Sequence, residues 1–513
     1  MVLSKGGCMR KLFRAFVAFL FAFLLPVSAL IAQQVSLTIL HTNDTHGRLR
    51  PFSYPTVAPP GSEFAGIALR TNIGGIARRA ALAKQLREEL GRKGTVVWMI
   101  DAGDFSDGTP FSTEYHGEAD VAAMNAAGYD FGTLGNHEFN FSLVQLKKLL
   151  GMFQYPILCA NVKDKSTGAL LTRASEIRNL GPVRIGLFGL VTRSGSDYPA
   201  ARDALTITDE IEAARQTVKE LRSNSDIIVA ISHCGEDIDT KIAEAVPEID
   251  VIVGGHSHSR IPQGEFVWRS GELKVGDVNS TVIVQAYQWG GELGRLDLIL
   301  SRDSGGVWRV ERQRAQLLAI TPDIPEDPTV AAIVDKYWKP IAARYGKVIG
   351  QAAADFIERG DDLAPYNLMA DSVRATFGTE IELENIGGVR APLVKGPITW
   401  ADLVDMDPFD NTIVTFKISG RRLKQVLQSE RPAVSGIRYR IEGGMISEVW
   451  VGGEPLNETR TYSGAANSYF ARNSLRGIAV HDTLKLRLNV LADYIRKQGT
   501  VRPVFDGRRV ILN

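Results

Sequence analysis

The sequence predicts an α/β protein of two domains, and three observations support this prediction. Its 513 residues exceed the roughly 100–200 residues of one compact domain. Between residue 35 and about residue 300, short apolar runs alternate with helical stretches, the pattern of an α/β domain. A proline-rich break at 321–328 then separates this half from a second half that also mixes strands and helices.

The periodicity of the first half predicts its elements. Strands are expected at seven apolar runs: Ser36–Leu40, Val96–Ile100, Pro156–Ala160, Arg184–Leu190, Ile227–Ser232, Asp250–Val253 and Thr281–Ala286. Helices are expected between several of these runs, at Ile76–Leu90, Leu143–Gly151 and Thr208–Asn224. We therefore assign residues 33–320 to one domain.

The second half begins after the proline-rich break. A helix-like stretch from Thr329 to Tyr345 follows, and we interpret residues 321–346 as a linker helix. Residues 347–513 are expected to form a smaller α/β domain, with helices at Leu363–Ala375 and Gly420–Gln428.

The N-terminus has the layout of a secretory signal peptide over residues 1–32. Basic residues precede an apolar run at 15–25, and small residues at 27–29 offer a cleavage site. The run is short for a membrane span, although an uncleaved anchor is the alternative. Once this peptide is removed, we expect a periplasmic or extracellular protein without a membrane span.

Composition excludes some partners. The chain is 44% hydrophobic and 23% charged, and its net charge of +1 does not favour nucleic acid or a membrane surface. We expect a monomer that acts on a small molecule. Cys159 and Cys234 are too few for a disulfide framework, which leaves one bridge or two buried thiols.

Polar side chains follow five predicted strands at the points where these strands end. The segments are His41–Gly47, Asp101–Asp104, Gly135–Glu138, His233 and Gly254–His258. They contain six of the eight histidines of the chain, at positions 41, 46, 137, 233, 256 and 258. Because open α/β sheets bind ligands at the carboxyl ends of their strands, this pattern predicts a single site.

The residue types indicate metal chemistry. Asp-x-His and His-x-His place two side chains on the same face of an extended segment. Seven oxygen and imidazole donors are too many for one tetrahedral ion, but they suit two ions about 3.5–4 Å apart that share a carboxylate. Such a pair can activate water and clamp a phosphoryl group. Ligands without thiolate fit Zn, Mn, Fe or Co.

These motifs resemble those of the 5′-nucleotidase family. Leu37–Leu49 (LTILHTNDTHGRL) and Tyr129–Asn140 (YDFGTLGNHEFN) resemble its two signature segments. Three others resemble the remaining metallophosphoesterase motifs: Asp101–Asp104 (DAGD), Ser232-His233 and Gly254–His258 (GGHSH). Two resemble segments of its C-terminal substrate-binding domain: Asn385–Arg390 (NIGGVR) and Asp407–Thr412 (DPFDNT). The similarity spans nearly the whole mature chain in the same order.

The resemblance implies a fold and a set of metal ligands. The fold is a sandwich of β-sheets flanked by helices, followed by a smaller α/β domain. One metal would be held by Asp44, His46, Asp104 and His258. The other would be held by Asp104, Asn136, His233 and His256, with Asp104 bridging the two. His137, with Asn140 near it, would stabilise charge on the phosphate or protonate the leaving group.

The resemblance also implies a substrate pocket in the second half. Arg390 would clamp the phosphate or a carboxylate-like group with its planar charged fork, and Phe409 would stack on a base. The remaining candidates are Asn385, Gly387, Gly388, Arg359 and Tyr469, with Phe470 as an alternative second aromatic. Phe409 and Tyr469 could instead be core residues.

The chain departs from the family pattern at three places. Nucleotidases of the family usually have Asp three residues after the motif histidine, and here that residue is Asn140. Because a neutral amide raises a histidine pKa less than an anion does, we expect a less cationic His137. The family's Gly-Gly-Asp-Gly loop has no match, and only Arg359 stands where the family has several arginines.

We therefore predict a secreted two-metal phosphoesterase that hydrolyses nucleoside 5′-phosphates by attack of a metal-bound hydroxide on phosphorus. The alternatives are a 2′,3′-cyclic nucleotide phosphodiesterase, another ester or thioester hydrolase of the superfamily, and a non-catalytic binding protein of the cell envelope. Closure of the two domains around substrate is expected, with a pivot near 329–345.

Overall fold

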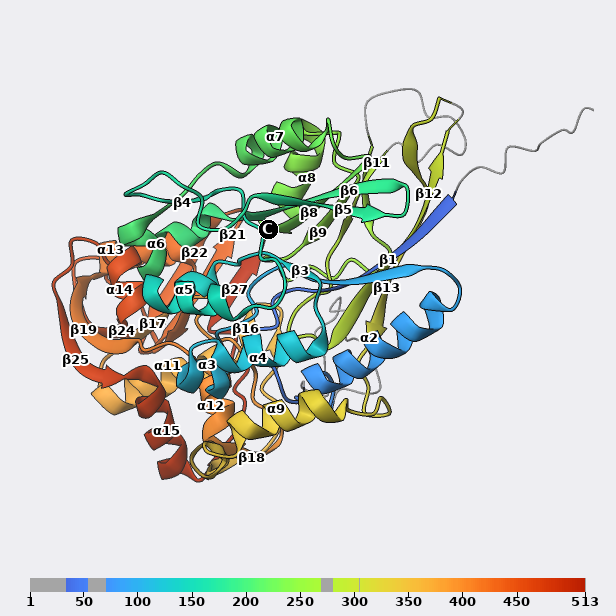
Figure 1. Cartoon of the computed structure of the whole chain (residues 1–513). Coiled ribbons are helices and arrows are strands. Elements are labelled where there is room, and N and C mark those ends of the chain that lie inside the picture. The colour runs from blue at the N-terminus through green and yellow to red at the C-terminus, as the bar shows by residue number, and fades with distance from the viewer. Residues whose placement is uncertain (1–33, 54–70, 269–279, 304, 513) are drawn as a thin grey trace, which may run out of the picture.

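The computed structural model describes residues 34–53, 71–268, 280–303 and 305–512. The predicted signal peptide, residues 1–32, lies outside these ranges. Among the helices within them, none is both long enough and apolar enough to cross a membrane. The predicted α/β class is confirmed: both halves combine sheets with flanking helices (Figure 1).

Two sheets form the centre of the first half. The five-stranded sheet runs in the order β13 (Trp308–Ala319), β12 (Glu292–Arg302), β1 (Gln34–Thr42), β2 (Val96–Asp101), β3 (Phe131–Gly132). The six-stranded sheet runs in the order β10 (Glu265–Trp268), β11 (Ser280–Val284), β9 (Val251–Gly254), β8 (Ile227–His233), β6 (Val183–Val191), β5 (Ser175–Leu180). Strands β1, β2 and β3 are parallel, as are β6, β8, β9 and β11, so their carboxyl ends converge.

The first half is a four-layer sandwich. One core cluster lies between the two sheets and includes Ile39, Ile100, Val229 and Val253. A second cluster packs helices on the outer face of the five-stranded sheet: α2 (Ile76–Gly91), α4 (Glu118–Ala127), α5 (Leu143–Met152) and α9 (Pro328–Trp338). A third packs α7 (Glu210–Leu221) and α8 (Glu236–Ala245) on the six-stranded sheet. Figure 1 shows α7 and α8 above the strands, with α2 and α9 below them.

Covered faces explain the sequence pattern of the central strands. Strand β8 is buried at every position, and β6 at all but one, because helices cover one face of the sheet and the other sheet covers the opposite face. Such strands appear as continuous apolar runs without alternation.

Shorter elements connect these layers. They are α3 (Pro110–Tyr115), the 3-10 turns η1 (His137–Phe139) and η2 (Arg193–Asp197), α6 (Pro199–Ala204), and the pair β4 (Val162–Asp164) and β7 (Leu205–Ile207).

The predicted strand at Pro156–Ala160 is wrong. Leu158 N–H donates to Gly132 O of β3, and two residues later Ala160 N–H donates to Gly189 O of β6. The segment therefore passes from one sheet to the other and forms only isolated bridges. A Cβ at Gly189 would lie 1.9 Å from Leu158 O, so this crossing requires glycine.

The predicted single linker helix is also wrong. Helix α9 ends at Trp338, and a separate short helix, α10, covers Ala342–Tyr345. Pro340 lies between them, and proline lacks the N–H that a continuous helix needs.

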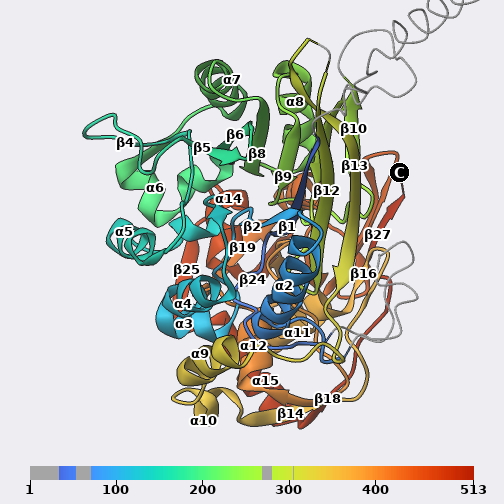
Figure 2. The same ribbon diagram turned by 45° about the vertical axis from the view of Figure 1, so that its right-hand side comes forward.

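The second half contains a five-stranded sheet in the order β20 (Ala433–Ser435), β17 (Ile381–Glu384), β24 (Thr461–Asn467), β19 (Thr412–Ser419), β25 (Val480–Leu486). Its helices are α11 (Ala364–Phe377), α12 (Trp400–Met406), α13 (Gly420–Glu430), α14 (Ser468–Ser474) and α15 (Arg487–Gln498). Smaller sheets are β23–β22–β21–β27 (Glu454–Pro455, Met445–Val451, Ile437–Glu442, Arg509–Leu512), β18–β14–β26 (Gly396–Thr399, Val348–Ala352, Thr500–Val501) and β15–β16 (Glu358–Arg359, Asp362–Leu363). Figure 2 shows α10, α15 and β14 at the end of the molecule opposite α7 and α8.

Cys159 and Cys234 are buried and free, so the two-thiol alternative holds in this structure.

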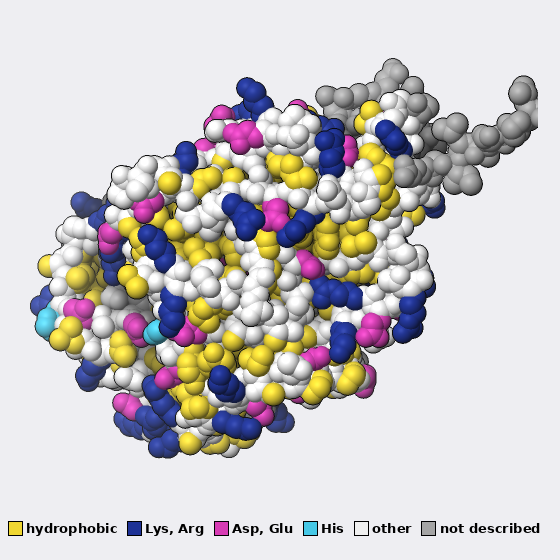
Figure 3. All heavy atoms as spheres, in the orientation of Figure 1, with side chains coloured by type: hydrophobic (Ala, Val, Ile, Leu, Met, Phe, Trp, Pro, Cys, Tyr) yellow, Lys and Arg dark blue, Asp and Glu magenta, His cyan; other side chains and the backbone are white. Residues whose placement is uncertain are grey.

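On the face seen in Figure 3, Lys and Arg side chains are scattered among acidic and uncharged ones.

Candidate active site

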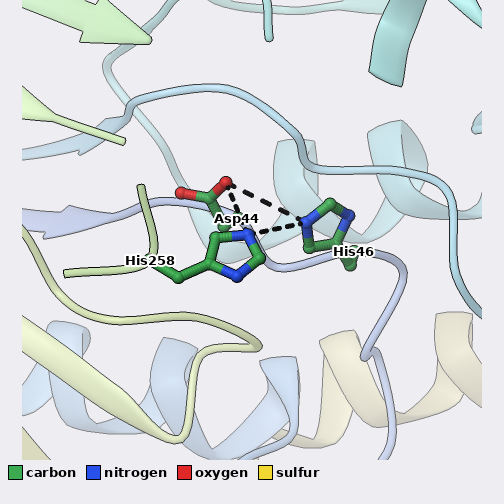
Figure 4. Close-up of side chains that lie close together, drawn as sticks. All are labelled: Asp44, His46 and His258. Carbon is green, nitrogen blue, oxygen red and sulfur yellow. Dashed lines mark hydrogen bonds and ion pairs between the residues drawn. The ribbon is translucent and has the colours of Figure 1, made fainter. Parts of the chain in front are cut away.

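The site forms where the carboxyl ends of the parallel strands of both sheets meet. Asp44 and His46 follow β1, Asp104 follows β2, Asn136 follows β3, His233 ends β8, and His256 and His258 follow β9. Six of these seven side chains fall into two groups whose ligand atoms lie within 4.8 Å of one another: Asp44, His46 and His258, and Asp104, His233 and His256. Figure 4 shows the side chains of the first group turned toward one another.

Asp104 belongs to the second group and also approaches the first. Its Oδ2 is 3.1 Å from His233 Nε2 and 3.9 Å from His46 Nε2. Asp44 Oδ1 is 3.2 Å from His258 Nε2 on the other side. Asp104 also forms a third such group with His46 and His137, so its carboxylate is placed to be shared by two ions.

The donor set fits divalent cations. Among the described residues, three buried atoms of the seven predicted ligands lack a hydrogen bond of good geometry: Asp44 Oδ1, Asn136 Oδ1 and His233 Nε2. His46 Nε2 and His258 Nε2 face each other at 3.2 Å. Each unsatisfied buried group costs roughly 1–3 kcal/mol. Cations among these atoms would satisfy all of them.

Hydrogen bonds on the far side of the ligands fix their orientation. His233 Nδ1 is 2.6 Å from Ala102 O, and His46 Nδ1 is 3.1 Å from Asp107 O, so Nε2 of each ring faces the centre. Asp44 Oδ2 accepts hydrogen bonds from the Asn43 amide and the His256 N–H, which leaves Oδ1 free for a ligand.

Backbone strain concentrates at the centre. Half of the non-glycine residues with positive φ in the described ranges belong to it: Asp44, His46, Asp104, Asp107, His256 and His258. Such conformations cost of order 1–3 kcal/mol each and persist where surrounding structure enforces them, typically at functional sites.

His41 does not belong to the centre. It is buried within β1, its ring packs where a Cβ of Gly294 would lie, and burial lowers its pKa to about 3. This histidine is structural.

Glu138 is a site residue that the sequence analysis missed. Its carboxylate accepts hydrogen bonds from the backbone N–H groups of Gly135 at 2.7 Å, Asp104 at 3.0 Å and Ser106 at 3.3 Å. It thus ties the loop after β3 to the loop after β2. Burial raises the pKa of Glu138 to about 8. The available signal was an acidic residue between His137 and the apolar Phe139, just after a strand end.

Gly135 is sensitive to substitution because it packs closely against Asp104. A Cβ at Gly135 would lie 2.1 Å from Asp104 Oδ1 and 2.3 Å from Asp104 N. We expect Gly135→Ala to displace Asp104 and to lower turnover by about 100-fold, the loss associated with disturbed ligand positions. Phosphate release with bound metal quantified in parallel measures this. Gly151→Ala in α5 is the control, because nothing lies within 4 Å of that Cβ. Equal turnover in the two variants would contradict the prediction.

His137 lies beside the ligand cluster and has a carboxylate partner. Its Nδ1 is 2.7 Å from Asp107 Oδ2, and its Nε2 is 4.0 Å from Asp104 Oδ2. Burial opposes charge on the ring, but Asp104 and Asp107 outweigh it and raise the pKa of His137. The sequence analysis expected a less cationic His137 beside the Asn140 amide, and it did not foresee that Asp107 supplies an anion to the same ring.

Tyr198 also borders the centre and was not predicted. It lies between η2 and α6, and its ring centroid is 5.6 Å from that of His137. Burial raises its pKa to about 12, so it remains a neutral phenol.

The second half reaches the centre through Arg390. Its Nη2 lies 3.4 Å from His46 Nε2. The space enclosed there is about 10 Å³ and is lined by His46, Arg48, Asp107, Gly108, His137, Trp289, Arg390 and Pro408. This space has room for about one water molecule and is too small for a phosphate ester in the arrangement that the structure shows.

Contacts beside the site hold the two halves together. Arg48 Nη1 lies 2.5 Å from Asp405 Oδ2 of α12, and the Arg48 guanidinium stacks over Trp289 at 4.5 Å. Near the linker, Glu114 Oε1 accepts hydrogen bonds from Arg344 at 2.6 Å and Tyr345 at 2.5 Å.

The other predicted pocket residues have different surroundings. Tyr469 is 52% exposed, so the core alternative fails for it, whereas neighbouring Phe470 is buried in the core. Phe409 is half-buried. The Arg359 side chain lies outside the described part of the structure.

Arg487 organises the two predicted pocket segments and was also missed. It is fully buried at the start of α15. Its guanidinium donates to Asp407 at 2.6 and 2.8 Å, to Glu384 at 2.5 Å and to Gly388 O at 2.8 Å. One side chain thus joins the 385–390 segment to the 407–412 segment. Within the first of these, Gly387 N–H donates to Tyr366 Oη, and Asn385 lies 2.8 Å from Asn467.

Fold and site together define a metal-dependent phosphoesterase with a second domain against its ligand cluster. Residues 37–260 match the family model of the calcineurin-like phosphoesterases, and residues 348–478 match that of the 5′-nucleotidase C-terminal domain. The structure resembles the 5′-nucleotidase precursor of Thermus thermophilus with a TM-score of 0.81 and 27% identity, covering 93% of this chain and 99% of that one.

Two relatives extend the comparison. The 5′-nucleotidase of Vibrio vulnificus (strain CMCP6) is 29% identical over 486 residues, 85% of this chain and 84% of that protein. Endonuclease YhcR of Bacillus subtilis (strain 168) is 30% identical over 439 residues, 80% of this chain but 34% of that protein, so the chain spans about a third of its length. The chain therefore has a calcineurin-like phosphoesterase domain followed by a 5′-nucleotidase C-terminal domain, and it is a metal-dependent phosphoric ester hydrolase.

Proposed function

We propose that the protein hydrolyses nucleoside 5′-phosphates or closely related nucleotides. The observation that carries the proposal is the contact between Arg390 and the ligand cluster, 3.4 Å from His46. A phosphate at the cluster would meet a guanidinium fork suited to its oxygens. The remainder of the substrate would extend toward the second-half segments that Arg487 joins.

Seven side chains would hold two divalent cations, drawn from Zn, Mn, Fe or Co. Asp44, His46, Asp104 and His258 would hold one, and Asp104, Asn136, His233 and His256 the other. When bound, such ions activate a water and polarise phosphoryl oxygens. The orphaned atoms of Asp44, Asn136 and His233 support this assignment.

Residues of the chain would perform the remaining steps. Arg390 orients the phosphate, and His137 delivers a proton to the leaving oxygen from Nε2, which faces the centre. Phe409 and Tyr469 would contact the base, and the exposure of Tyr469 leaves its ring accessible for stacking. Asn385, Gly387 and Gly388 would line the nucleoside side of the pocket.

The protein would act outside the cytoplasm as a monomer. Export to the periplasm or the exterior is supported by positions 1–32, where basic residues precede an apolar run and small residues follow it. A net charge of +1 and the mixed charges of the face in Figure 3 favour a small phosphate ester over nucleic acid.

A substrate panel tests the proposed function. The mature protein, loaded with Mn or Zn, is assayed against AMP, a UDP-sugar, a 2′,3′-cyclic nucleotide and an aryl phosphate. Highest kcat/KM on AMP or the UDP-sugar supports the proposal. A preference for the cyclic nucleotide, or activity on the aryl phosphate alone, would overturn it. Absence of any activity that depends on Asp104 would favour a binding protein.

A further inference from the structure

Asp107 connects three functional side chains from a strained position. It lies in the loop between β2 and α3 with φ of 74°, a left-handed conformation that Asp and Asn adopt more readily than other non-glycine residues. Its Oδ2 is 2.7 Å from His137 Nδ1 and accepts a hydrogen bond from the Asn140 amide. Its backbone carbonyl lies 3.1 Å from His46 Nδ1.

The loop that carries Asp107 is held in place. The backbone N–H of Asp107 donates to Ser112 Oγ at 2.8 Å, and Thr109 Oγ1 donates to Gly47 O at 3.0 Å. A Cβ at Gly47 would lie 2.6 Å from both hydroxyl oxygens. The carboxylate is therefore presented at a fixed place, with its side chain 14% exposed.

Hydrogen-bond chemistry assigns the protons. A carboxylate only accepts, so the Asn140 amide and His137 Nδ1 must both donate to Asp107. Asn140 Nδ2 and His137 Nδ1 lie 2.9 Å apart, and both carry protons, so their proximity comes from a shared acceptor. With a proton kept on Nδ1, the ring presents Nε2 to the centre, where Asp104 Oδ2 lies 4.0 Å away.

We propose that Asp107 is the positioning residue of His137 and supplies the carboxylate that family nucleotidases carry three residues after the histidine. In this chain Asn140 anchors that carboxylate from the family's usual position. The proposal rests on the proposed function, because it assigns His137 the proton transfer to the leaving oxygen.

Exchanging the two residues tests the proposal. Three variants are compared with wild type: Asp107→Asn, Asn140→Asp and the double exchange. An amide at 107 either accepts more weakly or turns its NH₂ toward Nδ1. Two carboxylates at 107 and 140 would repel each other. The double exchange restores one anion and one amide, and every variant keeps the backbone carbonyl that faces His46.

Leaving-group dependence separates proton transfer from general damage. The leaving group of AMP is the 5′-alkoxide of adenosine, which is strongly basic and needs a proton. The leaving group of an aryl phosphate is a phenolate, which is weakly basic. We expect Asp107→Asn to lower kcat about 100-fold on AMP, within the range of general acid catalysis, but less than about tenfold on the aryl phosphate. The double exchange should recover at least about tenfold on AMP.

A readout independent of turnover is the ring N–H of His137. In a sample labelled with ¹⁵N-histidine, its Nδ1–H signal, assigned through His137→Ala, should shift or disappear in Asp107→Asn while bound metal stays unchanged. The proposal is overturned if that signal stays unchanged, if kcat on AMP falls less than threefold, or if both substrates lose equally and the exchange recovers nothing. A wild-type protein inactive on every nucleotide would refute the proposed function alone, because the N–H signal still reports on Asp107.

Discussion

Replacing Asp104 with Asn should lower turnover by about 10³-fold or more and reduce the bound metal from two ions per chain to one or none. This loss exceeds the 10–100-fold typical of residues that only orient a ligand, because Asp104 lies 3.1 Å from His233 and 3.9 Å from His46 and would be a ligand of both ions. An amide keeps the shape of the side chain but removes the anion that two cations would share. Metal content by mass spectrometry and kcat on AMP measure the two effects.

Asp101→Asn is the matched control. Asp101 is equally buried and only three residues away, but it hydrogen-bonds Thr42 Oγ1 at 2.6 Å and the Gly103 N–H at 3.1 Å instead of the cluster. Burial raises the pKa of Asp101 to about 7, so a neutral amide is a fair substitute near that pH. This variant should keep two ions and most activity. If Asp104→Asn retained both ions and wild-type turnover, the bridging role would be wrong.

The fold and the ligand cluster were predictable because their signals are local. Strands buried on both faces must be apolar throughout, as β8 is, and ligands cluster where parallel strands end. Pro156–Ala160 failed because an apolar run has the same composition whether it pairs with one strand or crosses between two sheets.

Asp107 and Arg487 could not be predicted, because their roles depend on distant partners. The carboxylate of Asp107 reaches His137 only through a backbone with φ of 74° and a loop held by Ser112. Arg487 binds Asp407 and Glu384, which are 80 and 103 residues away in the chain. An arginine opening a helix is usually solvated, and only the folded chain shows that this one is buried.

Arg487→Met should destabilise the second half by about 3–5 kcal/mol, the loss expected when one partner of a buried ion pair is removed. Asp407 and Glu384 would lose their buried cationic partner in a site with no exposure, and Gly388 O would lose a donor. The 385–390 and 407–412 segments would separate, so KM for AMP should rise while bound metal stays at two ions. Thermal unfolding followed by circular dichroism, with KM and metal content, measures these effects.

Arg496→Met provides the comparison on the same helix. Arg496 pairs with Asp493 three residues earlier, its side chain is 44% exposed, and such pairs contribute about 0–1 kcal/mol. Unfolding and KM should therefore stay near wild type. Adding Glu384→Gln and Asp407→Asn to Arg487→Met should recover part of the lost stability, since no buried charge is then unpaired. If the triple variant were less stable than Arg487→Met alone, the loss would come from packing of the arginine side chain, and the ion-pair explanation would be wrong.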